Sequence, residues 1–165
     1  MKTKWRRFSS VVFATLILFT IVGGCNVFEN DNSIEGSWFQ ESVVESPLAG
    51  NVNLIQRLEV TFSADHSFES RRIVVDGSTD TILGYRFASR GEYSLLDDKL
   101  SMRTIESFSS DDVELYVPLG ELKPVTNVMS IVVTFKVDGD KMTWRYPPCP
   151  EDADCLDTQT FLRKP

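Results

Sequence analysis

The stretch MSIVVTFKVDGDKMTWRY, residues 129–146, decides the fold class of this chain. On either side of its central Asp-Gly-Asp every second residue is apolar: Ile131, Val133, Phe135 and Val137 before it, and Met142, Trp144 and Tyr146 after it. This alternation is typical of a β-strand with one buried face, because successive side chains point to opposite faces. Glycine, and to a lesser extent aspartate, tolerates the positive φ angles of tight turns. The stretch therefore predicts an antiparallel hairpin with strands over residues 128–138 and 140–146.

The same alternation recurs outward from this hairpin. Leu58, Val60 and Phe62 alternate with polar residues, and residues 158, 160 and 162 are expected to face opposite to residues 159, 161 and 163. Turn signals at 64–67, 76–80 and 97–99 separate further runs. The other strands are predicted at 36–45, 54–63, 67–75, 80–89, 91–96, 99–107, 113–118 and 157–163. Residues 118–128 contain two prolines and one glycine and are predicted to form a loop.

No stretch of the chain is convincingly helical, so the sequence predicts an all-β fold. An antiparallel meander of this length either leaves its edges exposed or closes on itself, and closure removes the unpaired backbone groups that favour aggregation. About eight strands form a barrel wide enough for side chains or for one small ligand. We therefore expect an antiparallel meander that closes into an up-and-down β-barrel of about eight strands.

The N-terminal residues are typical of a secretory signal peptide. Four basic residues (Lys2, Lys4, Arg6 and Arg7) precede the 12-residue apolar run Val11–Val22. A membrane-spanning helix needs roughly 20 apolar residues, so this run is too short to cross the hydrocarbon core. The small pair Gly23-Gly24 suits the pocket of a signal peptidase. The sequence predicts that residues 1–24 are removed.

Val22-Gly23-Gly24-Cys25 resembles a bacterial lipobox. The resemblance implies that Cys25 is lipidated and becomes the first residue of a chain held by membrane lipid, whereas the alternative is a buried cysteine in an uncleaved anchor. Asn26 stands where an aspartate would resemble an inner-membrane retention signal, so the resemblance favours the outer membrane of the cell envelope, facing the periplasm or the surface. Residues 25–33 then form a lipidated tether, and residues 34–165 form one domain.

The charge of the chain argues against nucleic acid as a partner. Without the four basic residues of the signal, 13 Lys and Arg stand against 24 Asp and Glu, a net charge of −11. A polyanion would be repelled by such a chain, and no basic stripe is present.

The other two cysteines lie close together in the sequence. In the stretch CPEDADC, Cys149 and Cys155 are expected to form a disulfide, since disulfides persist outside the cytosol. The alternative is a calcium site formed by the acidic residues around them, although the spacing lacks the glycine and the distal glutamate of an EF-hand: Glu151, Asp152, Asp154 and Asp157.

Five stretches, in this order along the chain, resemble the lipocalin-like lipoproteins of bacteria: IEGSWFQ (34–40), VTFSADHSFES (60–70), RGEYSLLDDKLSM (90–102), FKVDGDKMTWRY (135–146) and TFLRKP (160–165). The first contains the G-x-W signature that opens lipocalins. The resemblance implies a lipocalin-like barrel in which Trp38 of the first strand packs under Arg163 of the last strand. This cation–π contact would close one end of the barrel.

The sequence offers little for catalysis. The single histidine, His66, lies in a predicted turn, and no serine has the G-x-S-x-G context of a hydrolase. Zinc would need more His or Cys ligands than remain after lipidation and disulfide formation. Acidic pairs such as Asp97-Asp98 also lie in predicted turns. We expect no enzymatic activity, no cofactor and no metal, and keep an enzyme as the third hypothesis.

The first hypothesis is a membrane-anchored barrel that binds a small, largely apolar ligand. Its candidate ligand-binding residues are those expected to face inward, together with a possible counter-charge from Arg103 or Arg86: Tyr93, Met102, Arg103, Phe135, Met142, Trp144 and Tyr146. The alternative is an interaction or structural module that binds another envelope protein. Its contact candidates are residues 118–127 and the loop between Cys149 and Cys155. A tightly filled barrel interior would favour the alternative.

Overall fold

The computed structural model of the protein describes residues 33–44, 53–111, 116–126, 129–148 and 158–165. The predicted signal peptide, most of the tether, all three cysteines and the acidic residues between positions 150 and 157 lie outside these ranges. Within the described ranges, no helix has the length and apolar character that crossing a membrane requires.

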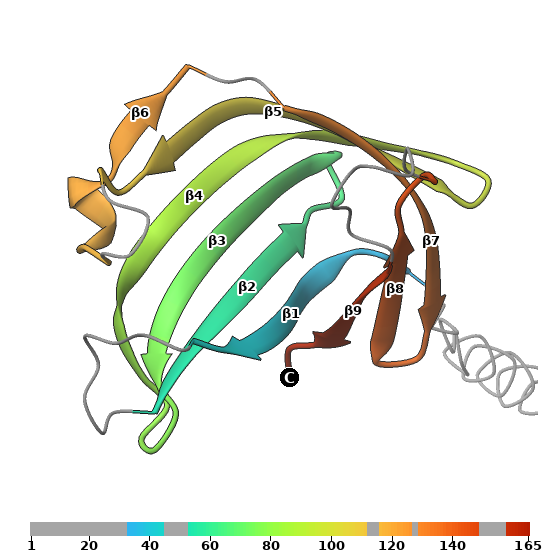
Figure 1. The fold of residues 1–165 in the computed structure, drawn as a ribbon. Helices are drawn as coiled ribbons and strands as arrows, with labels where there is room; N and C mark the ends of the chain where they lie inside the picture. Colours follow the sequence, from blue (N-terminus) through green and yellow to red (C-terminus); the bar gives the residue numbers. More distant parts are fainter. Residues whose placement is uncertain (1–32, 45–52, 112–115, 127–128, 149–157) are drawn as a thin grey trace, which may run out of the picture. The chain divides into compact units, whose positions relative to one another are not determined.

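The described residues form nine β-strands and one short 3₁₀ helix, η1 (Leu119–Glu121) (Figure 1). The strands are β1 (Gly36–Val43), β2 (Leu54–Phe62), β3 (Ser67–Asp76), β4 (Thr81–Leu96), β5 (Lys99–Ser109), β6 (Lys123–Val125), β7 (Ser130–Asp138), β8 (Lys141–Arg145) and β9 (Thr158–Arg163).

The strands close into a barrel. Their order is β4-β3-β2-β1-β9-β8-β7-β5, and β5 pairs in turn with β4, so eight antiparallel strands form a closed ring in up-and-down order. The short strand β6 adds to the far end of β5 (Figure 1). This arrangement confirms the predicted all-β barrel of about eight strands.

Two details of the predicted strands were wrong. The strands predicted at 80–89 and 91–96 are one strand, β4, because the backbone continues through Gly91 next to a β-bulge in β5. The segment predicted as a loop contains η1 and β6, because Pro124 is tolerated in a strand at a sheet edge. Of the strand predicted at 113–118, residues 113–115 lie outside the described ranges, and Val117 forms a single bridge to Tyr85.

A hydrophobic core occupies the barrel interior at the end where β1 starts and β9 finishes. This core cluster consists of Ile34, Trp38, Val60, Phe62, Phe68, Tyr93, Leu100, Met102, Val133, Val137, Met142, Trp144 and Phe161. Four side chains of intermediate exposure pack against it: Leu58, Ile131, Phe135 and Tyr146. The face of the strands that carries these residues is called the inner face below. The alternation read from residues 129–146 is confirmed.

The hairpin of β7 and β8 turns at Gly139, whose φ is 57°. An added Cβ would meet no atom within 4 Å, so the only cost of a larger residue is the conformational energy of the left-handed backbone. We therefore expect Gly139→Ala to lower the free energy of unfolding by about 1 kcal/mol, measured by urea unfolding of the full chain. Gly120→Ala is the control, since its Cβ also meets nothing within 4 Å and its φ is not left-handed. Equal stability of the two variants would contradict the prediction.

Candidate functional site

Trp38 and Arg163 lie together at one end of the barrel. They are cross-strand partners of β1 and β9, and the Arg163 guanidinium carbon lies 4.2 Å from the centroid of the Trp38 ring. Arg163 Nη1 and Nη2 donate to the carbonyl oxygens of Glu35 and Ser33 at 2.9 and 2.8 Å, and Trp38 Nε1 donates to that of Ile34 at 2.7 Å. The two side chains therefore hold residues 33–35 in place.

The glycine of the G-x-W stretch has a steric role in the same contact. Gly36 has a φ of 113°, which L side chains rarely adopt, and an added Cβ would lie 3.0 Å from Arg163 Nη1. Glycine thus allows the chain to enter β1 directly beside the guanidinium.

Most of the predicted ligand-binding residues belong to the packed core. Tyr93, Met102, Met142 and Trp144 are buried in the core cluster, and Phe135 and Tyr146 pack against it. Arg103 lies on the outer face, because its neighbour Met102 faces inward, and its Nη2 lies 3.0 Å from Glu92 Oε2. The expectation that Arg103 faces a ligand in the interior is therefore not met.

The two tyrosines among these residues remain protonated phenols. Burial raises the pKa of Tyr146, whose hydroxyl donates to Gln159 Oε1 at 2.8 Å. Burial, followed by the negative charges of Glu35 and Asp65, raises the pKa of Tyr93. The Tyr93 hydroxyl donates to the carbonyl oxygen of Ser63 at 3.0 Å. Both hydroxyl groups serve as hydrogen-bond donors within the barrel.

Beyond the core cluster, the inner face becomes polar. Cross-strand pairing aligns Gln40, Leu58, Arg72 and Phe87 in one row across β1 to β4. Leu58 packs against the core, and Arg72 follows the core residue Phe68 by four positions on the same strand, so this row points into the barrel. Arg72 is nevertheless exposed to solvent, so its side chain lies outside the packed core.

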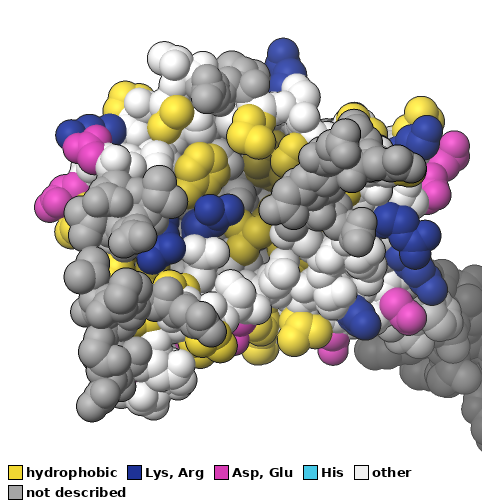
Figure 2. All heavy atoms as spheres, viewed as in Figure 1, with side chains coloured by type: hydrophobic (Ala, Val, Ile, Leu, Met, Phe, Trp, Pro, Cys, Tyr) yellow, Lys and Arg dark blue, Asp and Glu magenta, His cyan; other side chains and the backbone are white. Residues whose placement is uncertain are grey.

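A second arginine approaches from the neighbouring strand. Arg86 lies at a β-bulge between β3 and β4, and its Nη1 donates to Gln56 Oε1 at 3.3 Å. Gln56 is two residues from Leu58 on β2 and shares its inner face. Figure 2, viewed as Figure 1, shows Lys or Arg side chains near the middle of the visible surface with hydrophobic side chains around them. Arg86 was among the candidates read from the sequence, whereas Arg72, Gln40 and Gln56 were not.

On the described strands, the charged side chains in the middle of the inner face are arginines. On the described strands, the carboxylates alternate with inner residues and so face outward: Glu41, Glu59, Glu69, Glu92, Glu106 and Asp138. The exception is Asp76 at the end of β3, whose Oδ1 accepts a hydrogen bond from the backbone N–H of Ser78 at 2.8 Å. The middle of the inner face therefore carries Arg72 and Arg86, and the carboxylates of these strands, apart from Asp76, face away from it.

Buried polar atoms without a hydrogen-bond partner among the described residues include Gln40 Oε1, in the row of Arg72, and Trp144 Nε1, at the boundary of the core cluster. Trp144 is 3% exposed, and its ring centroid lies 4.4 Å from that of Phe161. Because an unpaired buried polar atom costs about 1–3 kcal/mol, these atoms are favourable positions for a polar group of a ligand.

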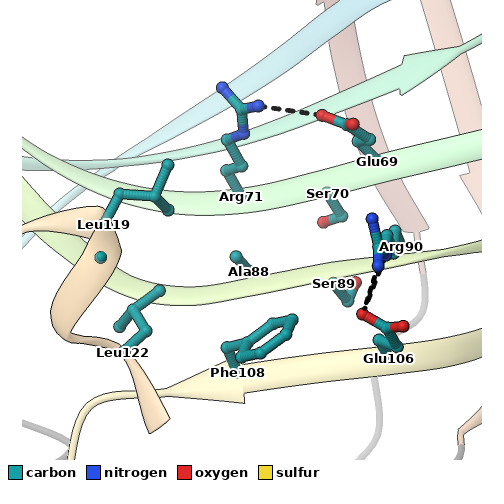
Figure 3. Close-up of a pocket in the computed structure, with 11 residues that line it drawn as sticks. Glu69, Ser70, Arg71, Ala88, Ser89, Arg90, Glu106, Phe108, Leu119 and Leu122 are labelled. Atoms are coloured by element: carbon teal, nitrogen blue, oxygen red, sulfur yellow. Dashed lines mark hydrogen bonds and ion pairs between the residues drawn. The ribbon is translucent and has the colours of Figure 1, made fainter. Parts of the chain in front are cut away.

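A separate hollow of about 390 Å³ lies on the outer face, where η1 and Leu122 cover β3, β4 and β5 (Figure 3). Leu119, Leu122, Phe108 and Ala88 form its apolar side. The other side carries the ion pairs Arg71–Glu69 (2.9 Å) and Arg90–Glu106 (2.7 Å) (Figure 3). The hydrogen bond from Arg90 holds the pKa of Glu106 below its usual value. Three of the contact candidates in residues 118–127, Leu119, Gly120 and Leu122, therefore line this hollow.

His66 lies where the turn pattern predicted it, exposed between β2 and β3, with a φ of 63° and its ring centroid 5.5 Å from that of Tyr93. In the part of the chain that the structure describes, no group of three or more His, Cys, Asp or Glu side chains is arranged around a common point that could hold a metal ion.

Comparisons of this chain with known protein families, with curated proteins and with solved structures found no match. The class of protein is therefore defined by the fold and the interior alone. It is a closed eight-stranded antiparallel barrel with a packed core at one end and, on the described strands, a polar inner face beyond the core that carries two arginines.

Proposed function

We propose that this protein is a lipocalin-like binding protein that holds a small ligand in the barrel interior beyond the core cluster, without catalysing a reaction on it. The observation that carries the proposal is the change of character along the inner face. Leu58, Phe135 and Tyr146 form a partly exposed apolar surface on the core, and polar side chains stand next to it. Ligand sites are typically apolar surfaces with a few polar groups that orient the ligand.

The second part of the proposal is the location. The lipobox-like stretch Val22-Gly23-Gly24-Cys25 supports a chain held in the cell envelope by lipid on Cys25, with the outer membrane favoured by Asn26. Each buried methylene of an acyl chain contributes about 0.8 kcal/mol, so two or three chains would make release rare. A ligand carried by such a protein would be bound close to the membrane.

Native mass spectrometry of the full chain, produced in an oxidising compartment, tests the binding proposal. We expect a reproducible added mass on the folded protein that is lost on denaturation. A ligand that contacts the apolar surface of the core cluster would remain bound during purification. The denatured spectrum also reports acylation of Cys25 and, through a loss of about 2 Da, a disulfide between Cys149 and Cys155. A folded protein that carries no added mass in repeated preparations would contradict the binding proposal.

The outer hollow favours one alternative function. Leu119, exposed to 41%, and Phe108 form an apolar surface next to two ion pairs, and this combination suits contact with another protein better than contact with water. In the alternative, the protein is an interaction module of the cell envelope that binds its partner through this hollow.

A further inference from the structure

We infer that the barrel's ligand is an amphiphile with one anionic group, and that Arg72 is the residue that pairs with this group. The inference rests on the proposed function and specifies the ligand class for the same site. Three observations support it: the charge of the inner face, the absence of a partner for the Arg72 guanidinium among the described residues, and the apolar surface next to Arg72.

The charge distribution is the first observation. The chain has a formal net charge of −7, yet the inner face places Arg72 and Arg86 on adjacent strands and directs the neighbouring carboxylates outward. An arginine such as Arg72, on the inner face and without a carboxylate partner among the described residues, favours a bound anion, and low-dielectric surroundings strengthen this attraction. An apolar ligand without charge would make no use of this arrangement.

The Arg72 side chain is the second observation. Four arginines of the outer face each pair with a carboxylate: Arg57, Arg71, Arg90 and Arg103. Within the described residues, the Arg72 guanidinium makes no hydrogen bond or ion pair, although it is exposed and points into the barrel. A guanidinium is planar and can bind a carboxylate or phosphate with two parallel hydrogen bonds. Arg72 is thus available for an anionic group that enters from solvent.

The surface beside Arg72 is the third observation. Leu58 is its direct cross-strand neighbour and packs on the core cluster, so an apolar tail can lie on the core while the head group reaches the guanidinium. Gln40, the next residue in the same row, has a buried Oε1 without a hydrogen-bond partner among the described residues. A hydroxyl group of the ligand next to its anionic group can donate to this oxygen. Both halves of an amphiphile therefore find a matching surface.

Isothermal titration calorimetry of the full chain at pH 8 tests the inference with four probes of equal tail length: decanoate, decyl phosphate, decan-1-ol and decylamine. We expect decanoate or decyl phosphate to bind at least about tenfold more tightly than decan-1-ol, since charge-assisted hydrogen bonds are about twice as strong as neutral ones. Decylamine should bind most weakly. Comparison of the two anions distinguishes a carboxylate ligand from a phosphate ligand.

Arg72→Gln and Arg71→Gln form a matched pair of variants, because they are adjacent, remove the same charge and differ in the face from which they remove it. We expect Arg72→Gln to weaken binding of the preferred anion by at least about tenfold, with little change for decan-1-ol. Arg71→Gln should leave both affinities unchanged. Thermal unfolding verifies that each variant is folded.

The possible failures are distinguishable. Equal affinities for the anions and for decan-1-ol, or equal losses in the two variants, would overturn the role of Arg72 and leave a binding barrel in place. No binding of any of the four probes would overturn both the anionic amphiphile and the proposed function. Should Arg72→Gln not fold, the comparison of decanoate with decan-1-ol on the unmodified chain still decides the inference.

Discussion

Trp38→Ala is expected to lower the free energy of unfolding by about 4 kcal/mol, which is a large fraction of the roughly 5–15 kcal/mol that stabilise an ordinary domain. Trp38 is fully buried, so truncation to alanine removes a large apolar surface and leaves a cavity at the end of the barrel. It also removes the ring beneath the Arg163 guanidinium and the hydrogen bond to the carbonyl oxygen of Ile34. Urea unfolding of the full chain, followed by circular dichroism, measures the change.

The neighbour Phe39 provides a control, since it is partly exposed on the opposite face of β1. We expect Phe39→Ala to cost clearly less than Trp38→Ala. A double-mutant cycle with Arg163→Ala should give a coupling of about 1–2 kcal/mol between Trp38 and Arg163, because the cation is held over the ring and partly desolvated. A similar loss in the two single aromatic variants would show that Trp38 does not support this end of the barrel.

Gly91→Ala is expected to lower the free energy of unfolding by about 3 kcal/mol. An added Cβ would lie 2.1 Å from the carbonyl oxygen of Arg103 and 2.8 Å from Phe68 Cε1. A flexible side chain could move aside, but the carbonyl belongs to the backbone of β5, which pairs with both β4 and β7. Relief of the clash therefore requires a shift of the barrel wall.

Gly120→Ala is the control for Gly91, as its Cβ meets no atom within 4 Å, and it should change stability by less than about 0.5 kcal/mol. The midpoint of urea unfolding is sufficient to separate the two variants. If Gly91→Ala were as stable as Gly120→Ala, then β4 and β5 would not approach each other as closely as described at the bulge.

The sequence predicted the direction of some side chains of the candidate site and not of others. Phe135, Met142, Trp144 and Tyr146 follow strict alternation, and their inward direction could be read from the sequence. Arg103 was placed wrongly, although the same alternation puts it opposite to Met102 on β5.

The direction of Arg72, in contrast, could not be predicted from the sequence. Arg72 precedes the apolar run Ile73-Val74-Val75, in which both faces of β3 are buried, so alternation does not assign a direction to the arginine. Its position became clear only from the pairing with Leu58 and Phe87 on the neighbouring strands. The bulge that turns Arg86 to the same side as Gln56 also depends on strand pairing.

The sequence by itself determined that this protein is an all-β chain whose strands alternate between apolar and polar faces, because the two-residue period of a strand is a local property. Its glycines and aspartates also located most of the turns. Only the tertiary structure decided that eight of the strands close into a ring, that the core fills one end of it, and that Arg72 and Arg86 share the remaining interior. The physical reason is that strand register and core depth result from contacts between residues far apart in the chain, which no local pattern contains.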